Sequence, residues 1–343
     1  MALTPGKIKG LENVSDDRGV IAAAAMDQRG SLKKALAAAA GGDVSDAQME
    51  EFKSLVTEVL TPYASAILLD PEYGLPASKR RAPNVGLLLA YEESGYDNTQ
   101  PGRLPDLLPH ESVQRLQRQG ADAVKVLIYY NPFERSDIND IKHAFIERIG
   151  DECAANDIPF FLEFVGYDPQ GGDEKGVEYA KRKPQIVSGS MLEFAKPQYG
   201  VDVLKVEVPV NMKFVEGTQS FTGVAAYSKQ EAIEYFRQTS ESVSKPFIYL
   251  SAGVSNAEFT ETLQLVGDNS IRFAGVLCGR ATWADGISVY GKEGADAFRR
   301  WLEREGVRNI EAVNERLKAA QPWYSFYGVS SPEALNPRAM TRV

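Results

Sequence analysis

Cysteine and histidine are scarce in this sequence, and their scarcity argues against several classes of protein. Only two cysteines and two histidines occur in 343 residues. Cys153 falls in a predicted helix and Cys278 in a predicted strand, so no disulfide framework is indicated. We therefore expect the protein to be located in the reducing environment of the cytoplasm. His110 and His143 fall in predicted helices, away from strand ends. A histidine-based zinc site is therefore not expected, and we predict that no metal or other cofactor is needed.

The sequence also lacks long apolar runs and an excess of basic residues. No run approaches the ~20 residues of a transmembrane helix, so no membrane span is predicted. The short apolar stretch at 20–26 directly follows Asp16, Asp17 and Arg18, which suits a buried strand after a turn better than a signal peptide. The formal net charge of −9 argues against nucleic acid or an anionic membrane as a partner. A local basic pocket for phosphate remains compatible with this charge.

Eight short, β-rich apolar runs recur along the chain, with helical patterns between most of them. Near-continuous apolar runs, in place of alternating ones, are typical of parallel strands that helices cover. The expected strands are residues 20–26, 64–70, 86–92, 123–130, 160–167, 203–210, 247–253 and 273–280. They predict an α/β fold, a (β/α)8 TIM barrel. A doubly wound open sheet is the alternative, but no GxGxxG motif follows the first strand.

Helical patterns fill most of the links between these strands, and several begin with Ser, Asn or Asp at the cap position. The expected helices are residues 44–60, 110–120, 136–156, 228–243 and 256–267. The link at 71–85 holds three prolines, so only a short helix is expected there.

Polar loops and a C-terminal extension complete the expected architecture. The loops at 93–106 and 167–176 are rich in Gly and Pro and follow strand ends, where barrel enzymes build their active sites. We expect a single barrel domain over residues 1–343, to which residues 291–343 add two helices and a tail.

Charged residues interrupt three of the apolar strands. The run VDVLKVEVPV at 201–210 carries Lys205 and Glu207, which point the same way because residues i and i+2 share a face of a strand. Lys125 and Glu163 lie near the third position of their own runs. Bare charges in a core are costly, so they usually serve a paired structural role or chemistry. If the registers match, Lys125, Glu163 and Lys205 point into the barrel at similar depth.

Further charges end the first and third strands. Asp27 ends the first strand and is followed by Gln28 and Arg29, and Glu92 ends the third strand. A buried ion-pair network without chemistry is one interpretation of this set. Glu207 is interpreted as a structural partner that balances the charge of the barrel interior.

Two lysines beside carboxylates in a dry site suit Schiff-base chemistry. A lysine is a nucleophile only as the neutral amine, which burial and a neighbouring cation favour. Lys125 would act on Lys205 in this way, or the reverse. The amine condenses with a ketone, the protonated imine withdraws electrons, and a neighbouring C–C bond breaks. Glu163 can move the protons, so the pattern predicts a class I aldolase, a carbon–carbon lyase.

A phosphate site is expected at the ends of the seventh and eighth strands. The turn SAGVS at 251–255 and the Gly279–Arg280 pair each lie between a strand and a helix. Backbone N–H groups at two such turns form the common phosphate site of (β/α)8 barrels. Arg280 and Arg29 would supply charge for one or two phosphates.

The sequence resembles the tagatose 1,6-bisphosphate aldolase family of class I aldolases, from about residue 3 to about residue 320. The resemblance is carried by AMDQRGSLKKAL, LLDPEYGLPASK, LLLAYEESGYDNT, GADAVKVLIYYNP, IPFFLEFVGYD, VDVLKVEVPVN, IYLSAGVS and GVLCGRATWA. It implies a (β/α)8 barrel that cleaves D-tagatose 1,6-bisphosphate to dihydroxyacetone phosphate and glyceraldehyde 3-phosphate.

The resemblance also implies roles for single residues. Lys205 matches the Schiff-base lysine of the family and Glu163 matches its proton-shuttling carboxylate. Asp27, Gln28 and Lys125 match the polar surroundings. Together with the barrel argument, the resemblance assigns the phosphate loops to Ser251, Gly253, Gly279 and Arg280.

Alternatives for the substrate and for the function stay open at this level. Residues 99–112 and 321–340 follow the family pattern less closely, and the first segment would line the substrate pocket. Related proteins act on fructose 1,6-bisphosphate or on 6-deoxy-6-sulfofructose 1-phosphate, and the configuration at C4 leaves no trace in one sequence. A non-catalytic sugar-phosphate sensor is an alternative of another class. A homo-oligomer is compatible with the family, but no interface signature is visible.

Overall fold

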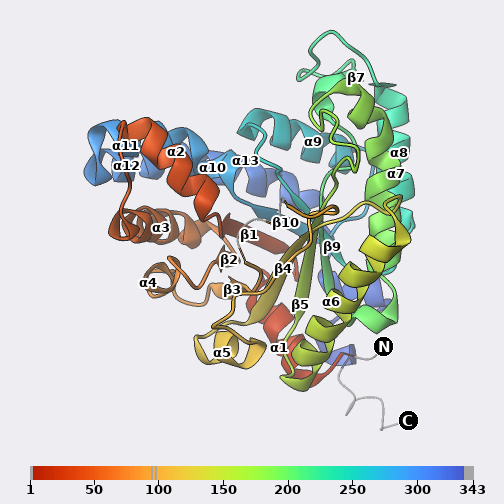
Figure 1. Ribbon diagram of the computed structural model, residues 1–343, viewed down its shortest axis with the longest axis horizontal. Coiled ribbons are helices and arrows are strands. Elements are labelled where there is room, and N and C mark those ends of the chain that lie inside the picture. Colours follow the sequence, from red (N-terminus) through yellow and green to blue (C-terminus); the bar gives the residue numbers. More distant parts are fainter. Residues whose placement is uncertain (1–2, 94–95, 97–98, 336–343) are drawn as a thin grey trace.

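Eight parallel strands close into a barrel in the order β1–β10–β9–β6–β5–β4–β3–β2 (Figure 1). The computed structural model describes residues 3–93, 96 and 99–335. The barrel strands are β1 Ile21–Met26, β2 Ala66–Leu69, β3 Gly86–Ala90, β4 Ala123–Tyr129, β5 Phe160–Val165, β6 Val203–Val206, β9 Phe247–Leu250 and β10 Gly275–Cys278. All eight predicted strands are confirmed. Pairing of β1 with β10 closes the sheet, so the open doubly wound alternative is wrong.

Helices surround the barrel (Figure 1). They are α1 Pro5–Asn13, α2 Gly30–Ala40, α3 Asp46–Leu60, α4 Leu75–Ser78, α5 Val113–Arg118, α6 Ser136–Ala155, α7 Val177–Phe194, α8 Lys229–Glu241, α9 Asn256–Asp268, α10 Arg280–Trp283, α11 Ile287–Glu293, α12 Ala295–Trp301 and α13 Val307–Arg316. A two-stranded pair, β7 Val215–Glu216 and β8 Tyr227–Ser228, lies between β6 and α8. None of the helices in the described ranges is long and apolar enough to cross a lipid bilayer.

Local capping explains where several helices begin. Ser45 and Gln48 form a capping box at the start of α3, and Ser228 and Glu231 form another at the start of α8. The prediction that His110 lies in a helix is wrong. Ser112 accepts a hydrogen bond from the Arg115 N–H and caps α5, so His110 lies in the turn before the helix.

The bounds of two of the larger helices were not predicted from the sequence. α7 contains Pro184, which cannot donate a backbone hydrogen bond and therefore weakens a helical pattern. α2 is mostly alanine after its first turns, and a run of alanines does not distinguish a buried face from an exposed one. Both helices follow barrel strands, as the alternating β/α order requires.

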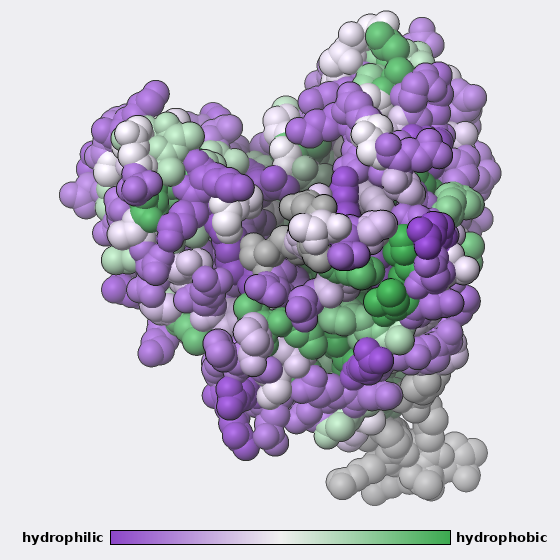
Figure 2. Space-filling view, viewed as in Figure 1, coloured by the Kyte–Doolittle hydropathy of each residue, from purple (hydrophilic) through white to green (hydrophobic). Residues whose placement is uncertain are grey.

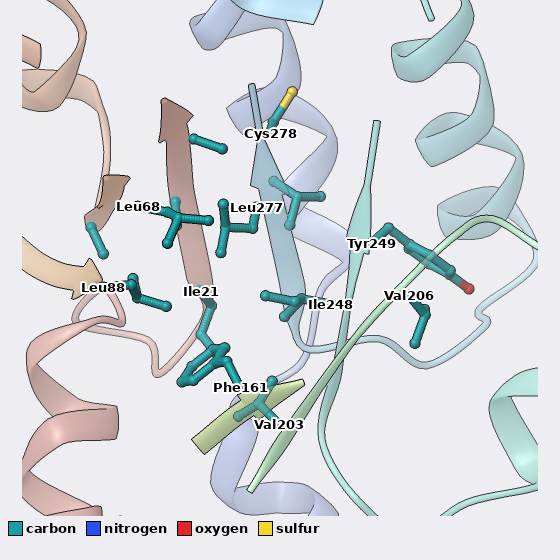
Figure 3. Packing of buried hydrophobic residues seen from close by; sticks show 14 of the residues in the cluster. Ile21, Leu68, Leu88, Phe161, Val203, Val206, Ile248, Tyr249, Leu277 and Cys278 are labelled. Atoms are coloured by element: carbon teal, nitrogen blue, oxygen red, sulfur yellow. The ribbon is translucent and has the colours of Figure 1, made fainter. Parts of the chain in front are cut away.

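Apolar side chains fill the amino-terminal part of the barrel interior (Figure 3). Ile21, Phe161 and Val203 are fully buried and point inward from three strands (Figure 3). Because side chains alternate along a strand, the inward positions two residues further on are Glu163 in β5 and Lys205 in β6. The barrel is therefore apolar at its amino end and charged at its carboxyl end.

The C-terminal segment binds the amino end of the barrel. The Trp323 N–H donates to the Gly19 carbonyl at 2.9 Å, and the Gln321 N–H donates to the Phe273 carbonyl at 2.9 Å. The Trp323 side chain is fully buried. Residues after α13 thus form part of the hydrophobic core.

Candidate active site

A cavity of about 390 Å³ opens at the carboxyl ends of the barrel strands. All ten residues that the sequence assigned to the site line it: Asp27, Gln28, Arg29, Lys125, Glu163, Lys205, Ser251, Gly253, Gly279 and Arg280. Figure 2 shows the surface hollowed between the lobe that carries α2 and α11 and the lobe that carries α7 and α8. The barrel topology therefore brings together residues that lie as far apart as the first and last strands.

Glu163 is shared by two buried lysines. Its register partner on β6 is Lys205, and the Lys205 Nζ donates to Glu163 Oε2 at 2.8 Å. The Lys125 Nζ lies 2.8 Å from the same oxygen. All three side chains are at least nine-tenths buried. One carboxylate oxygen therefore bridges two buried amino groups.

Lys125 is held as a cation by three carboxylates. Its Nζ lies 2.8 Å from Asp27 Oδ2, Glu92 Oε1 and Glu163 Oε2. Burial opposes a charge on Lys125, but the three carboxylates outweigh burial and raise its pKa well above the ordinary value. Lys125 thus stays protonated and anchors the carboxylates around it.

The expectation that Lys125, Glu163 and Lys205 lie at one depth is wrong for Lys125. In the sheet register Lys125 pairs with Phe161, two residues before Glu163. Strands of a closed barrel are staggered, so equal positions within apolar runs do not lie side by side. The long lysine side chain spans this offset and reaches the carboxylates from below.

The pKa values of Asp27 and Glu92 shift in opposite directions, although both carboxyl groups contact Lys125. Burial disfavours the charged form of Asp27, but Lys125 and Lys205 outweigh it and lower the pKa of Asp27. For Glu92, burial outweighs the attraction of Lys125 and Arg29, and its pKa is raised. Glu92 was not assigned to the site from the sequence, although its place at the end of the third expected strand was the available signal.

The end of β1 and the loop after it are held by hydrogen bonds from Lys53. The Lys53 Nζ, from α3, donates to the carbonyls of Met26 and Gln28, each at 2.7 Å, and also to the Asp70 carboxylate. Nothing in the sequence marked Lys53, which occupies one position of an ordinary amphipathic helix. These bonds fix the backbone on which Asp27, Gln28 and Arg29 are carried.

The ends of β9 and β10 form a small cradle. Gly253 has φ +79, in the left-handed region that favours glycine, and a Cβ there would lie 2.8 Å from Arg280 Cζ. The Arg280 guanidinium therefore lies directly over the Gly253 backbone. Ser251 and Gly279 line the same part of the cavity, which suits a small anion.

Glu207 contacts groups outside the lysine pair. Its Oε1 lies 3.2 Å from the Lys183 Nζ of α7, and its Oε2 accepts a hydrogen bond from the Gly166 N–H at 2.8 Å. Glu207 thus connects β6 to α7 and to the end of β5. Its contacts fit the predicted structural role, with Lys183 and not Lys205 as the partner.

Comparison with known proteins places this geometry among aldolases. Residues 21–285 match the family model described as DeoC/LacD family aldolase. Tagatose 1,6-diphosphate aldolase of Listeria innocua serovar 6a is 54% identical over 327 residues, which cover 95% of this chain and 96% of that protein. The protein of the same name from Lactococcus lactis subsp. lactis is 51% identical over 324 residues, covering 94% and 99%.

A solved structure shares the fold at low sequence identity. Fructose-bisphosphate aldolase from Plasmodium falciparum superposes with a TM-score of 0.64 at 13% identity, over 96% of this chain and 98% of that one. At this identity the likeness concerns the fold alone. It agrees with the closed eight-stranded barrel.

Proposed function

The chain belongs to the DeoC/LacD family of aldolases, and we propose that it is a class I aldolase that cleaves D-tagatose 1,6-bisphosphate to dihydroxyacetone phosphate and glyceraldehyde 3-phosphate. The names of relatives that are 51% and 54% identical support the choice of substrate. The observation that carries the mechanism is the Glu163 oxygen shared by Lys205 and Lys125. We further propose a cytoplasmic enzyme that needs no metal or organic cofactor.

The first phase forms the imine. The C1 phosphate binds in the cradle of Ser251, Gly253 and Arg280, which brings the C2 carbonyl to Lys205. Lys205 passes a proton to Glu163 and attacks C2 as the neutral amine. The C2 oxygen takes one proton from the attacking nitrogen and becomes a hydroxyl, and Glu163 returns its proton to this hydroxyl, so water leaves and a protonated imine remains. Lys125 keeps its own proton throughout, because three carboxylates stabilise the cation.

The second phase breaks the C3–C4 bond. A base removes the proton of the C4 hydroxyl, C4 becomes the aldehyde, and the electron pair of the broken bond moves into the imine to give an enamine. We assign the base to Glu163, because the lowered pKa of Asp27 makes that carboxylate a weak proton acceptor. Asp27 orients the sugar. Glu163 then protonates C3 of the enamine, and hydrolysis releases dihydroxyacetone phosphate and restores Lys205.

Fructose 1,6-bisphosphate and 6-deoxy-6-sulfofructose 1-phosphate are the competing substrates under the same mechanism. They retain the phosphate on C1 and the C2 carbonyl, so the cradle and Lys205 act on them in the same way. Steady-state cleavage of each ketose by the purified protein ranks them. The proposal expects the highest kcat/KM on D-tagatose 1,6-bisphosphate.

Borohydride trapping tests the mechanism directly. The protein is incubated with dihydroxyacetone phosphate and EDTA, reduced, digested and mapped by mass spectrometry. The expected product is a reduced adduct on Lys205, formed by the wild type and not by Lys205→Ala, which should also lose ketose cleavage. Absence of an adduct from every lysine of the wild type would contradict the class I mechanism and favour a sugar-phosphate sensor.

A further inference from the structure

A cavity of about 580 Å³ lies at the amino end of the barrel, whereas the catalytic cavity lies at the carboxyl end. Residues 237–244, before β9, and 270–272, before β10, form two of its walls, and Phe326 of the C-terminal segment forms a third. None of the described residues lines both this cavity and the catalytic one. A ligand of this cavity is therefore a molecule other than the reacting ketose.

Arg272 brings an unpaired guanidinium to the cavity. No hydrogen bond or ion pair joins this guanidinium to another described residue, and its Nε is buried. The guanidinium lies over the Phe326 ring, 4.2 Å from the ring centre, and this stacking restrains its plane but satisfies none of its N–H groups. A buried charged donor without an acceptor costs about 1–3 kcal/mol or more. Such a donor indicates that an acceptor from a ligand binds there.

Four serines supply hydroxyl groups to the same cavity: Ser240, Ser242, Ser244 and Ser270. The hydroxyls of Ser240 and Ser242 donate to backbone carbonyls, each at 2.8 Å. Ser244 and Ser270 are exposed, and their hydroxyls have no hydrogen-bond partner among the described residues. Two free hydroxyl donors therefore accompany the free guanidinium.

The negative groups around the cavity do not neutralise Arg272. The charged residues of its lining are two arginines and one glutamate, which leaves a net positive charge. Arg237 pairs with Glu234 at 3.1 Å, and Glu241 is exposed, so water screens its charge. The carboxyl ends of α8 and α9 also lie here, and helix dipoles disfavour anions at such ends. Residues that follow each helix donate hydrogen bonds to carbonyls of its last turn, which reduces this effect.

We propose that this cavity binds a small phosphate ester, with the Arg272 guanidinium and the Ser244 and Ser270 hydroxyls donating to it. A planar guanidinium matches two oxygens of a phosphate, and the third oxygen remains for a hydroxyl donor. A carboxylate offers only two oxygens to the same three groups. The cavity has the volume of a small-molecule site, so it accommodates the organic part of the ester. The site goes beyond the proposed function, because it lies at the opposite end of the barrel from Lys205.

Equilibrium dialysis of the purified full chain against labelled inorganic phosphate counts the sites. The wild type should bind one equivalent more than Arg272→Gln, whose affinity at this site should fall by about 10–100-fold, the loss expected for charged hydrogen bonds. Arg300→Gln is the matched control. Arg300 is exposed on α12 and lines neither cavity, so this variant should bind as many equivalents as the wild type.

A pair of variants at an exposed position keeps the test independent of the Arg272–Phe326 stack. Ser244→Glu and Ser244→Gln introduce side chains of the same size that differ in charge. The glutamate places a carboxylate in the cavity with Arg272, so it should weaken phosphate binding at this site by about fivefold relative to the glutamine. Equal affinities in the two variants would contradict the site.

Competition identifies the class of ligand. Glycerol 3-phosphate should displace the equivalent that depends on Arg272, and acetate at the same concentration should displace little of it. Equal stoichiometry in the wild type and Arg272→Gln would overturn the site, and equal displacement by acetate would overturn the assignment to a phosphate ester. Neither result depends on Lys205, so ketose cleavage remains a separate test of the proposed function.

Discussion

Three cations and three carboxylates form one network at the site. Ion pairs join Lys125, Lys205 and Arg29 to Asp27, Glu92 and Glu163. Removing each charge from water costs free energy. Ion pairing offsets part of this cost, because every member of the network has an oppositely charged neighbour. Removing one member therefore affects the protonation of the others as well as the chemistry.

Lys125→Met tests this dependence. The variant leaves buried carboxylates without their shared cation, so we expect the free energy of unfolding to fall by about 3–5 kcal/mol at pH 7.5. In the wild type the lowered pKa of Asp27 stabilises the fold above the ordinary aspartate pKa, and this stability is lost as the pH falls toward the folded pKa. Without Lys125 burial outweighs the remaining attraction of Lys205, so the folded pKa of Asp27 rises above the ordinary aspartate value, and protonation of Asp27 should restore stability to the variant as the pH falls from 7.5 to 4.5.

Urea unfolding at pH 7.5 and pH 4.5 measures the effect. The difference in free energy of unfolding between the wild type and Lys125→Met should be smaller at pH 4.5 than at pH 7.5. Lys181→Met, which removes an exposed ion pair with Glu178, is the control and should change little at either pH. An equal difference at both pH values would argue against the electrostatic role of Lys125.

Glu163→Gln tests the proton-shuttling role of a single residue. The amide keeps the shape of the side chain but cannot accept and return protons, so kcat should fall by about 10²–10⁴-fold. The rate of adduct formation with dihydroxyacetone phosphate should fall as well, since dehydration to the imine also uses Glu163. Glu178→Gln, at an exposed position, serves as the control. A loss in kcat of less than tenfold for Glu163→Gln would show that another residue transfers the protons.

At the scale of elements, Arg103 connects the two loops beside the cavity. Its guanidinium donates to the Glu174 carboxylate at 2.6 Å and lies 5.0 Å from the ring centres of Tyr96, Tyr129 and Tyr167. Tyr129 lines the catalytic cavity. The loops at 93–106 and 167–176 were predicted to form the active-site rim, and these contacts couple them across β4.

Arg103→Gln should loosen both loops together. We expect faster amide hydrogen exchange in residues 167–176 and a KM raised by about 3–10-fold, because the ordered position of the substrate depends on the rim. Hydrogen-exchange mass spectrometry and steady-state kinetics give the two readouts. Arg135→Gln, which removes an exposed pair with Asp137, is the control. Unaltered exchange at 167–176 would show that Arg103 does not couple the loops.

At the scale of the whole molecule, the segment after α13 packs against the amino end of the barrel. Trp323 is fully buried, and Phe326 packs edge-on against Phe247 of β9 with ring centres 5.9 Å apart. The Arg272 guanidinium lies 4.2 Å from the centre of the Phe326 ring. We propose on these contacts that residues 1–343 form one folding unit, in which 291–343 complete the barrel.

Trp323→Ala tests whether the C-terminal segment and the barrel unfold as one unit. Removing a buried tryptophan should lower the free energy of unfolding by about 3–5 kcal/mol. Far-UV circular dichroism and tyrosine fluorescence should still report one coincident transition, at lower urea than in the wild type. Phe133→Ala, at a position 71% exposed, is the control. A separate early transition of the C-terminal segment would contradict the single unit.

Much of the fold and of the site could be predicted from the sequence, for a physical reason. A strand buried in a parallel barrel is a continuous apolar run, so its identity is a local property, and all eight runs became barrel strands. Parallel strands end at one rim, so polar residues at strand ends converge whatever their separation in the chain. This is why Asp27, Lys205 and Arg280 share one cavity.

Only the tertiary structure decided which charged groups meet. The stagger of the closed barrel places Lys125 below Glu163 and makes Glu92 its neighbour, and no local pattern encodes that offset. The contacts of Lys53 and Arg103 likewise depend on how helices and loops pack after closure. Sequence periodicity determines which face a residue occupies, whereas distances between side chains on different strands arise only when the barrel closes.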